Sequence, residues 1–297
     1  MSVSPLVTIG LPVFNRERFV RQSIESLLNQ TFRDFQLIIS DNASTDGTGK
    51  ICEEYARKDR RVRYFRNSEN IGLSPNFNRA FSLSESPYFK WSTSDDYWAS
   101  TMIERALEIM EADRSIVLCY PKTTLVNQEG GDAQPYEDNL HLVSDDPKER
   151  FIKLLGQIAL AHQHTGLIRA ESLSRTHLLG VYPGSDVVLL AELTLYGKFF
   201  EIPERLYFRR FHEESSSWLR TSQEHQNKFY LSSKSSKVSM NRWRRYLGLM
   251  SAVHTAPVGL RDRWSLYRYI GRLMRWDRNA LVAEVAARFK TVVSATS

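Results

Sequence analysis

The sequence predicts an α/β fold, with a mainly parallel sheet flanked by helices and a basic helical extension at the C-terminal end. Short apolar segments alternate with segments whose apolar residues recur at helical spacing, which is typical of right-handed βαβ units. Each expected helix is about 10–14 residues long, enough to cross back over a sheet. Residues 225–297 contain 14 Lys and Arg against 3 Asp and Glu, whereas the preceding residues contain 26 against 31. An acidic body is therefore expected to carry a basic tail.

Five strands are expected in the first half of the chain. The first, Leu6–Leu11, is expected to end at Pro12, because proline donates no hydrogen bond to a neighbouring strand. The other four are Phe35–Ser40, Val62–Phe65, Tyr88–Ser92 and Ile116–Tyr120. Ligands bind at the carboxyl ends of strands in open sheets of this type, so the segments that follow should converge on one crevice. These segments are Pro12–Asn15, Asp41–Asp46 and Ser94–Asp96.

Helices are expected between the strands. Ser74 followed by Pro75 predicts a helix N-terminus, and Thr101 with Glu104 matches a capping box. Other helices are expected to begin near Val20, Thr48, Pro147 and Asp186. Further strands are expected at Thr165–Arg169, Phe199–Pro203 and Leu206–Arg210, and residues 130–149 have the composition of an acidic loop.

The composition is that of a globular protein, with 42% hydrophobic and 25% charged residues. The N-terminus lacks the basic and apolar regions of a signal peptide, and no run of 18 apolar residues predicts a transmembrane helix. Cys52 and Cys119 lie far apart in periodic segments, so we expect two buried thiols in a reducing compartment. These features predict a cytoplasmic protein.

Adjacent carboxylates follow the fourth expected strand, at Asp95 and Asp96. Two such charges repel each other. Capping of the next helix would explain them simply, but Thr101 and Glu104 already serve that helix, and both acids lie well upstream. A divalent cation, Mg²⁺ or Mn²⁺, bound between carboxylate oxygens and substrate phosphates would remove the repulsion.

A third acid, Asp41, ends the second expected strand. Its carboxylate could accept a hydrogen bond from the N3–H of uracil or thymine, or it could form an Asx turn with Asn42 and Ser44. Neither GxGxxG after the first strand nor GxxxxGK[ST] is present, so a dinucleotide-binding fold and a P-loop kinase are poorly supported.

Three segments together resemble family 2 glycosyltransferases of the GT-A fold. They are VTIGLPVFNRERFVRQSIESLLNQTFRDFQLIISDNASTDGT, NIGLSPNFNRAF and STSDDYW, and the resemblance runs from about residue 6 to residue 212. It implies transfer of a sugar from a nucleotide-sugar, usually with inversion, by an enzyme that uses a divalent metal. It also implies a catalytic domain at 1–224, with a nucleotide-sugar half to about residue 125 and an acceptor half beyond it, and a basic helical extension at 225–297.

The resemblance assigns roles by position. Asp41 matches the acid that binds the base, Asp95 the acid that reaches the ribose, and Asp96 the main metal ligand. The remaining matches to nucleotide-sugar-binding positions are Pro12, Phe14, Asn15, Gly72 and Asn78. Two departures stand out: Thr93 replaces a frequent acid, and Phe77 replaces a frequent arginine that contacts the donor.

The downstream segment YPGSDVVLLAELTLYGKFFEIPERLYFRRFHEESSS resembles the second block of the family. There Asp186 matches the catalytic base, although an Asp at this point also suits a helix N-cap. His212 matches a metal or diphosphate ligand, although a lone histidine is more often structural. Arg209 or Arg210 could help to stabilise the charge on the leaving diphosphate.

These matches predict an inverting transferase that moves a sugar from a UDP- or dTDP-sugar to a saccharide or lipid-linked acceptor, in the synthesis of surface polysaccharide or glycolipid. The basic aromatic tail suits peripheral contact with an anionic membrane at the inner face, although a solvated helical cap with interior aromatic residues explains it more simply. Two rival functions are a nucleotidyltransferase, which would release pyrophosphate, and a nucleic-acid-binding protein. The basic residues lie away from the acidic crevice and no nucleic-acid-binding motif is present, so we expect no nucleic-acid partner.

Overall fold

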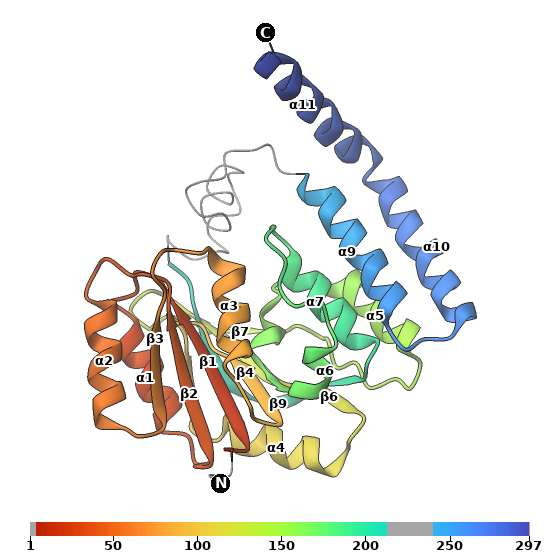
Figure 1. Cartoon of the computed structure of the whole chain (residues 1–297). Coiled ribbons are helices and arrows are strands. Elements are labelled where there is room, and N and C mark those ends of the chain that lie inside the picture. The colour runs from red at the N-terminus through yellow and green to blue at the C-terminus, as the bar shows by residue number, and fades with distance from the viewer. Residues whose placement is uncertain (1–3, 213–239, 297) are drawn as a thin grey trace.

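The computed structural model describes residues 4–212 and 240–296 (Figure 1). The predicted domain boundary at residues 224 and 225 lies outside these residues. A mixed sheet of nine strands forms the centre of the described structure, in the order β3-β2-β1-β4-β8-β6-β9-β5, with β7 beside β6. The strands are β1 (Val7–Val13), β2 (Phe35–Asp41), β3 (Val62–Arg66), β4 (Tyr88–Trp91), β5 (Tyr97–Trp98), β6 (Ile116–Val126), β7 (Gln134–Tyr136), β8 (Leu167–Arg169) and β9 (Lys198–Arg210).

The first four strands of this order pair in parallel, as the βαβ pattern predicts, and β6 also runs parallel to β9. The antiparallel strand β8 joins these two parts, because it lies between β4 and β6. The short strands β5 and β7 are antiparallel to β9 and β6. The sheet therefore combines a parallel first half with a mixed second half.

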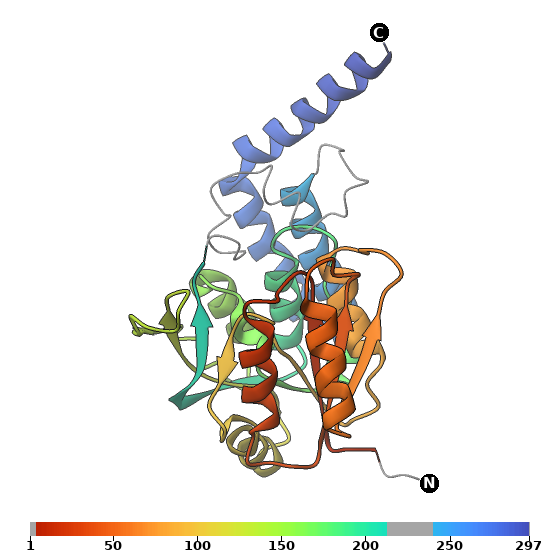
Figure 2. The ribbon, with the colours of Figure 1, turned by 90° about the vertical axis from the view of Figure 1, so that its left-hand side faces the viewer.

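Helices cover both faces of the sheet (Figures 1 and 2). Residues of α1, α2 and α4 share one apolar core with β1, β2 and β3, and residues of α3, α5 and α7 share a second core with β4 and β6. These helices are α1 (Val20–Leu28), α2 (Thr48–Lys58), α3 (Leu73–Ser82), α4 (Met102–Ala112), α5 (Pro147–Gln157) and α7 (Ser185–Thr194), with a 3₁₀ turn η1 (His162–Thr165) and the short α6 (Ala170–Ser174) between them.

The C-terminal extension is helical, as predicted. It consists of α9 (Asn241–Thr255), α10 (Leu260–Trp276) and α11 (Arg278–Thr296). α9 packs on α7, and α10 packs on α9 and α5. In both views α11 projects from the body (Figures 1 and 2). Among the residues that the structure describes, no helix is long and apolar enough to cross a membrane.

Both expected proline boundaries are wrong, for one physical reason. Pro12 lies inside β1, opposite Ser40 of β2, but β4 pairs with β1 only as far as Gly10. Pro203 lies inside the single strand β9, where the register with β6 shifts. A proline costs a strand little where no neighbour needs its missing N–H, at an unpaired edge or a bulge.

Several other expected boundaries also differ. α3 begins at Leu73 with Gly72 at its N-cap, so Ser74 does not cap it. No side chain caps α4, because Glu104 instead accepts a hydrogen bond from the Thr31 hydroxyl at 2.7 Å. The predicted strand at 165–169 is divided between η1 and β8. Cys52 and Cys119 are free and buried, as predicted.

Gly10 sets the close approach of α3 to the sheet. A Cβ at this position would lie 2.6 Å from Cζ of Phe89 and 3.0 Å from Cβ of Ala80. We expect Gly10→Ala to lower the free energy of unfolding by about 1–3 kcal/mol, because the buried ring has little room to move. Gly156→Ala in α5 is the matched control, since nothing lies within 4 Å of its added Cβ. That control should raise stability by up to about 1 kcal/mol in urea unfolding. Equal stability of the two variants would contradict the packing argument.

Candidate active site

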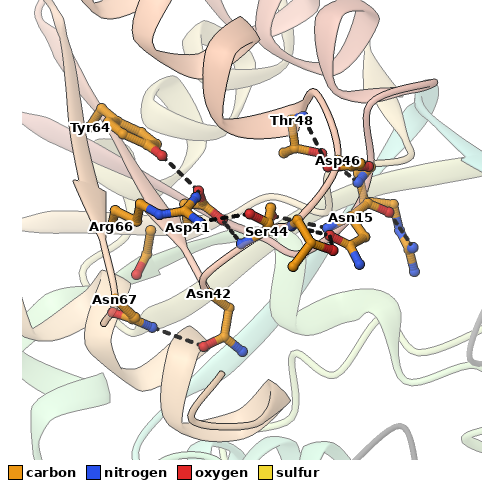
Figure 3. Close-up of polar contacts among 12 residues, drawn as sticks. Asn15, Asp41, Asn42, Ser44, Asp46, Thr48, Tyr64, Arg66 and Asn67 are labelled. Carbon is orange, nitrogen blue, oxygen red and sulfur yellow. Dashed lines mark hydrogen bonds and ion pairs between the residues drawn. The ribbon is translucent and has the colours of Figure 1, made fainter. Parts of the chain in front are cut away.

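Polar side chains gather at the carboxyl ends of β1, β2 and β3, as Figure 3 shows. Asp41 is the centre of this cluster. Its Oδ2 accepts hydrogen bonds from the Tyr64 hydroxyl and from Nη1 of Arg66, both at 2.6 Å, and its Oδ1 accepts from the Ser44 amide at 2.9 Å. Arg66 also donates to the Ser44 carbonyl at 2.7 Å. The expected turn hydrogen bond is therefore present, and the carboxylate has two further partners from β3.

We expect Asp41→Ala to lower the free energy of unfolding by about 2–3 kcal/mol, because three donors lose their acceptor in a site with no exposed carboxylate surface. Arg66 can turn to solvent, since 45% of its side chain is exposed, and this limits the loss. Asp145→Ala is the control: that side chain is 94% exposed, so the change should stay within about 0.5 kcal/mol. Urea unfolding monitored by circular dichroism measures both, and a loss at Asp41 no larger than at Asp145 would contradict the prediction.

The loop after β1 is fixed by hydrogen bonds to the turn after β2. Asn15 has a positive φ of 49°, which Asn tolerates better than most residues. Its amide donates to the Ser44 hydroxyl at 3.1 Å, and its Oδ1 accepts from the Thr45 amide at 2.8 Å. Phe14 at the start of this loop is 39% exposed, whereas Pro12 is buried within β1. Of these matches to the first nucleotide-contacting loop, Phe14 and Asn15 lie in the loop itself.

The two predicted residues around α3 hold backbone in position. Gly72 has a φ of 93°, which favours glycine, and its carbonyl accepts from Nδ2 of Asn42 at 3.1 Å. The Asn78 side chain forms two hydrogen bonds with the backbone of Leu179. Its Nδ2 donates to the Leu179 carbonyl at 2.9 Å, and its Oδ1 accepts from the Leu179 amide at 3.2 Å. Asn78 thus ties α3 to the loop that leads into α7.

The adjacent acids have different environments. Asp96 is buried: its Oδ1 accepts from the Arg210 amide at 2.7 Å, and its Oδ2 accepts from the hydroxyls of Thr93 and Tyr207. Asp95 is 18% exposed, and its Oδ2 lies 3.0 Å from Nε2 of His212. Both oxygens of Asp96 thus accept hydrogen bonds from protein donors, whereas Asp95 and His212 face each other.

The pKa values of these two acids are shifted in opposite directions. Burial alone would raise the pKa of Asp95, but the hydrogen bond to His212 and the charge of Arg16 hold that pKa below its usual range. Burial and the neighbouring Asp95 charge raise the pKa of Asp96. Nε of Arg16 lies 4.0 Å from Oδ2 of Asp95, and the Arg16 amide donates to the Thr48 hydroxyl at 2.7 Å. Arg16 therefore links the acidic pair to the loops around Asp41.

Asp186 lies in the first turn of α7, just after Gly184, which has a φ of 84° and forms the turn into the helix. Its Oδ1 accepts from the adjacent Val187 amide at 2.9 Å. The pKa of His164 is lowered mainly by burial, and the Asp186 charge opposes this shift while the Arg209 charge reinforces it.

Arg209 links this region to the acidic pair. Its charge lowers the pKa of Asp96, although burial and Asp95 raise that pKa more. Its Nη1 lies 3.1 Å from Nδ1 of the buried His162. Arg209 therefore acts on the pKa values of both Asp96 and His164, and Asp186 acts on the pKa of His164.

Several residues of this site escape sequence reasoning. Tyr64 and Arg66 are two positions apart on β3, so their side chains lie on the same face of that strand. This spacing could have placed both side chains next to Asp41, once β3 was known to be the neighbour of β2. Tyr207 is 111 positions from Asp96, and His212 is 117 positions from Asp95. No local pattern reveals pairs so far apart in sequence.

Comparison with known proteins bears on this arrangement. A family model described as Glycosyl transferase family 2 matches residues 8–176, which is more than half of the chain. The chain belongs to glycosyl transferase family 2. The resemblance noted in the sequence is therefore confirmed, and this family 2 glycosyltransferase can be compared with named relatives.

Three relatives have related sequences. TuaG of Bacillus subtilis, described as a putative teichuronic acid biosynthesis glycosyltransferase, is 28% identical over 57% of this chain and 67% of its own length. Chondroitin synthase of Escherichia coli is 27% identical over 72% of this chain, and EpsJ of Bacillus subtilis, an uncharacterized glycosyltransferase, is 36% identical over 39% of it. The matched segments span only 30% of chondroitin synthase and 33% of EpsJ.

Solved structures with low sequence identity share the fold. Staphylococcus aureus TarS 1-349 in complex with UDP superposes with a TM-score of 0.65 at 15% identity, covering 92% of this chain and 73% of TarS. The mannosyltransferase PcManGT from Pyrobaculum calidifontis, in complex with GDP-Man and Mn²⁺, gives a TM-score of 0.55 at 13% identity, covering 99% of this chain and 80% of PcManGT. The predicted GT-A fold is confirmed.

Proposed function

We propose that this family 2 glycosyltransferase moves a sugar from a UDP- or dTDP-sugar to an acceptor hydroxyl with inversion, using Asp186 as general base. The observation that carries the proposal is the contact of Asp95 with His212 at 3.0 Å, with the guanidinium of Arg16 on the same carboxylate oxygen. Asp186 in the first turn of α7 and Arg209 on β9 both act on the pKa of His164. An anionic diphosphate and a hydroxyl that loses a proton need these two kinds of groups within a short distance.

The donor base would bind near Asp41. A carboxylate offers about four acceptor positions, and Asp41 uses three of them, so one remains for the N3–H of uracil or thymine. Arg66 would have to move aside to open this position, and 45% of its side chain is exposed to solvent. UDP in a TarS structure and UDP-GlcNAc in another support a pyrimidine nucleotide donor.

A divalent cation, Mg²⁺ or Mn²⁺, fits the residues present if the substrate supplies most of its ligands. The described residues contain no cluster of three or more His, Cys, Asp or Glu that could hold a metal alone. Asp95 and His212 would hold the ion, because their facing atoms are 3.0 Å apart and the oxygens of Asp96 already accept from protein donors. A cation bound by one or two protein groups plus phosphates is typical of Mg²⁺ sites, and it would neutralise diphosphate charge.

The proton and the leaving group take separate routes. The acceptor oxygen forms a bond to the anomeric carbon from the face opposite the diphosphate, and the bond from that carbon to the diphosphate oxygen breaks. Asp186 takes the hydroxyl proton, and the guanidinium of Arg209 would stabilise the negative charge on the departing phosphate. A single displacement of this kind inverts the configuration and needs no nucleophilic side chain.

The acceptor is proposed to be a saccharide or a lipid-linked saccharide, in the synthesis of a cell-surface polysaccharide or glycolipid. The descriptions of TuaG and chondroitin synthase support this class. Within the chain, we propose that residues up to about 125 bind the donor and residues from about 126 to 224 bind the acceptor. Asn78 on α3 is hydrogen-bonded to the loop before α7, so it would connect the donor-binding part of the chain to the acceptor-binding part.

A donor screen tests the proposal. The protein is incubated with UDP-, dTDP- and GDP-sugars, with Mn²⁺, Mg²⁺ or EDTA, and released nucleoside diphosphate is measured. We expect release from a pyrimidine nucleotide-sugar that depends on the cation. Release of pyrophosphate from a nucleoside triphosphate and a sugar phosphate would instead indicate a nucleotidyltransferase.

A further inference from the structure

α10 is anchored to the body by one face only. Leu266 and Ile270 are fully buried, and Tyr267, Leu273 and Met274 pack partly buried against the same core. Its acidic neighbours also point towards protein partners: Asp262 pairs with Lys148 at 2.9 Å, and Asp277 pairs with Arg242 at 3.1 Å. The residues of α10 that are buried or ion-paired therefore lie on the side of the helix that faces the body.

The opposite face combines arginine and tryptophan. Spacings of three and four residues bring six exposed side chains onto one side of the helix. Trp264 is 68% exposed and Trp276 is 87% exposed. We call this set the Arg/Trp stripe: Arg261, Trp264, Arg268, Arg272, Arg275 and Trp276. In the described part of the chain, no carboxylate lies within ion-pair distance of these four guanidinium groups.

Large apolar side chains are also exposed at the start of α10 and on α11. Leu260 at the start of α10 is 72% exposed, and Val282 and Phe289 on α11 are 67% and 68% exposed. α11 projects beyond the body in both views, on the side of the carboxyl ends of β1–β3, where the candidate active site lies (Figures 1 and 2). Large apolar side chains so exposed on two successive helices indicate a partner with an apolar layer.

We propose that the Arg/Trp stripe and the start of α11 bind the surface of an anionic lipid bilayer. Lipid phosphates would pair with the four guanidinium groups, and the indoles would lie at headgroup depth with the aliphatic side chains below them. A soluble polyanion satisfies the arginines but offers nothing to Leu260 or Val282. Docking in this way would bring the carboxyl ends of β1–β3 towards acceptors held in the bilayer. The surface itself does not depend on which donor the enzyme uses.

Vesicle flotation tests the proposal with the full chain. Vesicles of pure phosphatidylcholine are compared with vesicles that contain 30% phosphatidylglycerol, at low and at high salt. We expect binding to the anionic vesicles at least tenfold stronger than to the neutral ones, and weaker as salt rises. Replacement of the four stripe arginines by Gln should lower this binding at least tenfold.

Two further variants separate lipid binding from general charge. Lys50, Arg57, Lys58 and Arg60 lie exposed on or next to α2, far from α10 (Figures 1 and 2), and their replacement by Gln removes the same charge. This control should bind anionic vesicles within about twofold of wild type. Trp264→Ser with Trp276→Ser should lower binding about tenfold, and all variants should retain the wild-type circular dichroism spectrum.

Three results would overturn the proposal. They are equal binding to neutral and anionic vesicles, equal losses in the two arginine sets, and binding of single-stranded DNA or polyphosphate without binding of vesicles. A dimer in sedimentation velocity that the stripe variants convert to monomer, with no vesicle binding by wild type, would assign the face to a second copy of the chain instead.

Discussion

Asp186→Asn is expected to lower kcat by about 10²–10⁴-fold while the affinity for the nucleotide-sugar stays within about twofold. The amide can still accept the hydrogen bond from the Val187 amide, so the first turn of α7 keeps that contact. The loss of a helix-terminal charge should cost less than about 1 kcal/mol of stability. The substitution therefore removes the proposed base and leaves the fold and the donor site in place.

Turnover is measured as release of nucleoside diphosphate in the presence of acceptor, and donor affinity by calorimetry with the nucleotide-sugar. Asp145→Asn, on an exposed side chain, is the matched acid-to-amide control and should retain full activity. If Asp186→Asn kept more than half of the wild-type kcat, the base would have to be another residue.

Asp95→Asn is expected to lower kcat/KM by about 10²–10³-fold and to remove the stimulation by Mn²⁺. Its carboxylate is the partly exposed member of the pair and faces His212. Asp96→Asn should act differently, because it replaces a buried carboxylate that accepts from the Arg210 amide and from the hydroxyls of Thr93 and Tyr207. We expect that variant to lose about 3 kcal/mol or more of stability.

The two variants are compared by activity over a Mn²⁺ titration and by urea unfolding. EDTA should lower wild-type activity to the level of Asp95→Asn and should leave the activity of that variant unchanged. A stable Asp96→Asn variant without metal response, beside an Asp95→Asn variant with normal response, would restore Asp96 as the main ligand.

The first half of the fold follows from local patterns because each βαβ unit is complete within a short stretch of chain. Val20, Ile24 and Leu27 form one face of α1, and their spacing alone predicts the helix and its buried side. The position of β8 in the sheet cannot be predicted in this way, because β8 pairs with β4 and β6, which are distant from it in the sequence. No periodicity in Leu167–Arg169 indicates antiparallel neighbours.

The candidate site divides in the same way. Asp41 and the acidic pair are found from strand ends, because parallel strands bring their carboxyl ends to one edge. Which member of the pair is held by protein donors depends on Tyr207, Arg210 and His212, which follow the pair by more than 110 positions in the sequence. The sequence therefore predicts where the candidate site lies, but it does not predict the different environments of Asp95 and Asp96.

The long strand β9 has a consequence for how the family can diversify. Tyr207, Arg209 and Arg210 lie in its last four positions, and His212 follows two residues after its end. Side chains alternate between the two faces of a strand, so deletion or insertion of one residue after Pro203 would exchange the sides on which Tyr207 and Arg210 emerge. Length changes of two residues would preserve their sides. Viable natural variants should therefore differ here by even numbers of residues, and engineered donor-site loops would do well to follow the same parity.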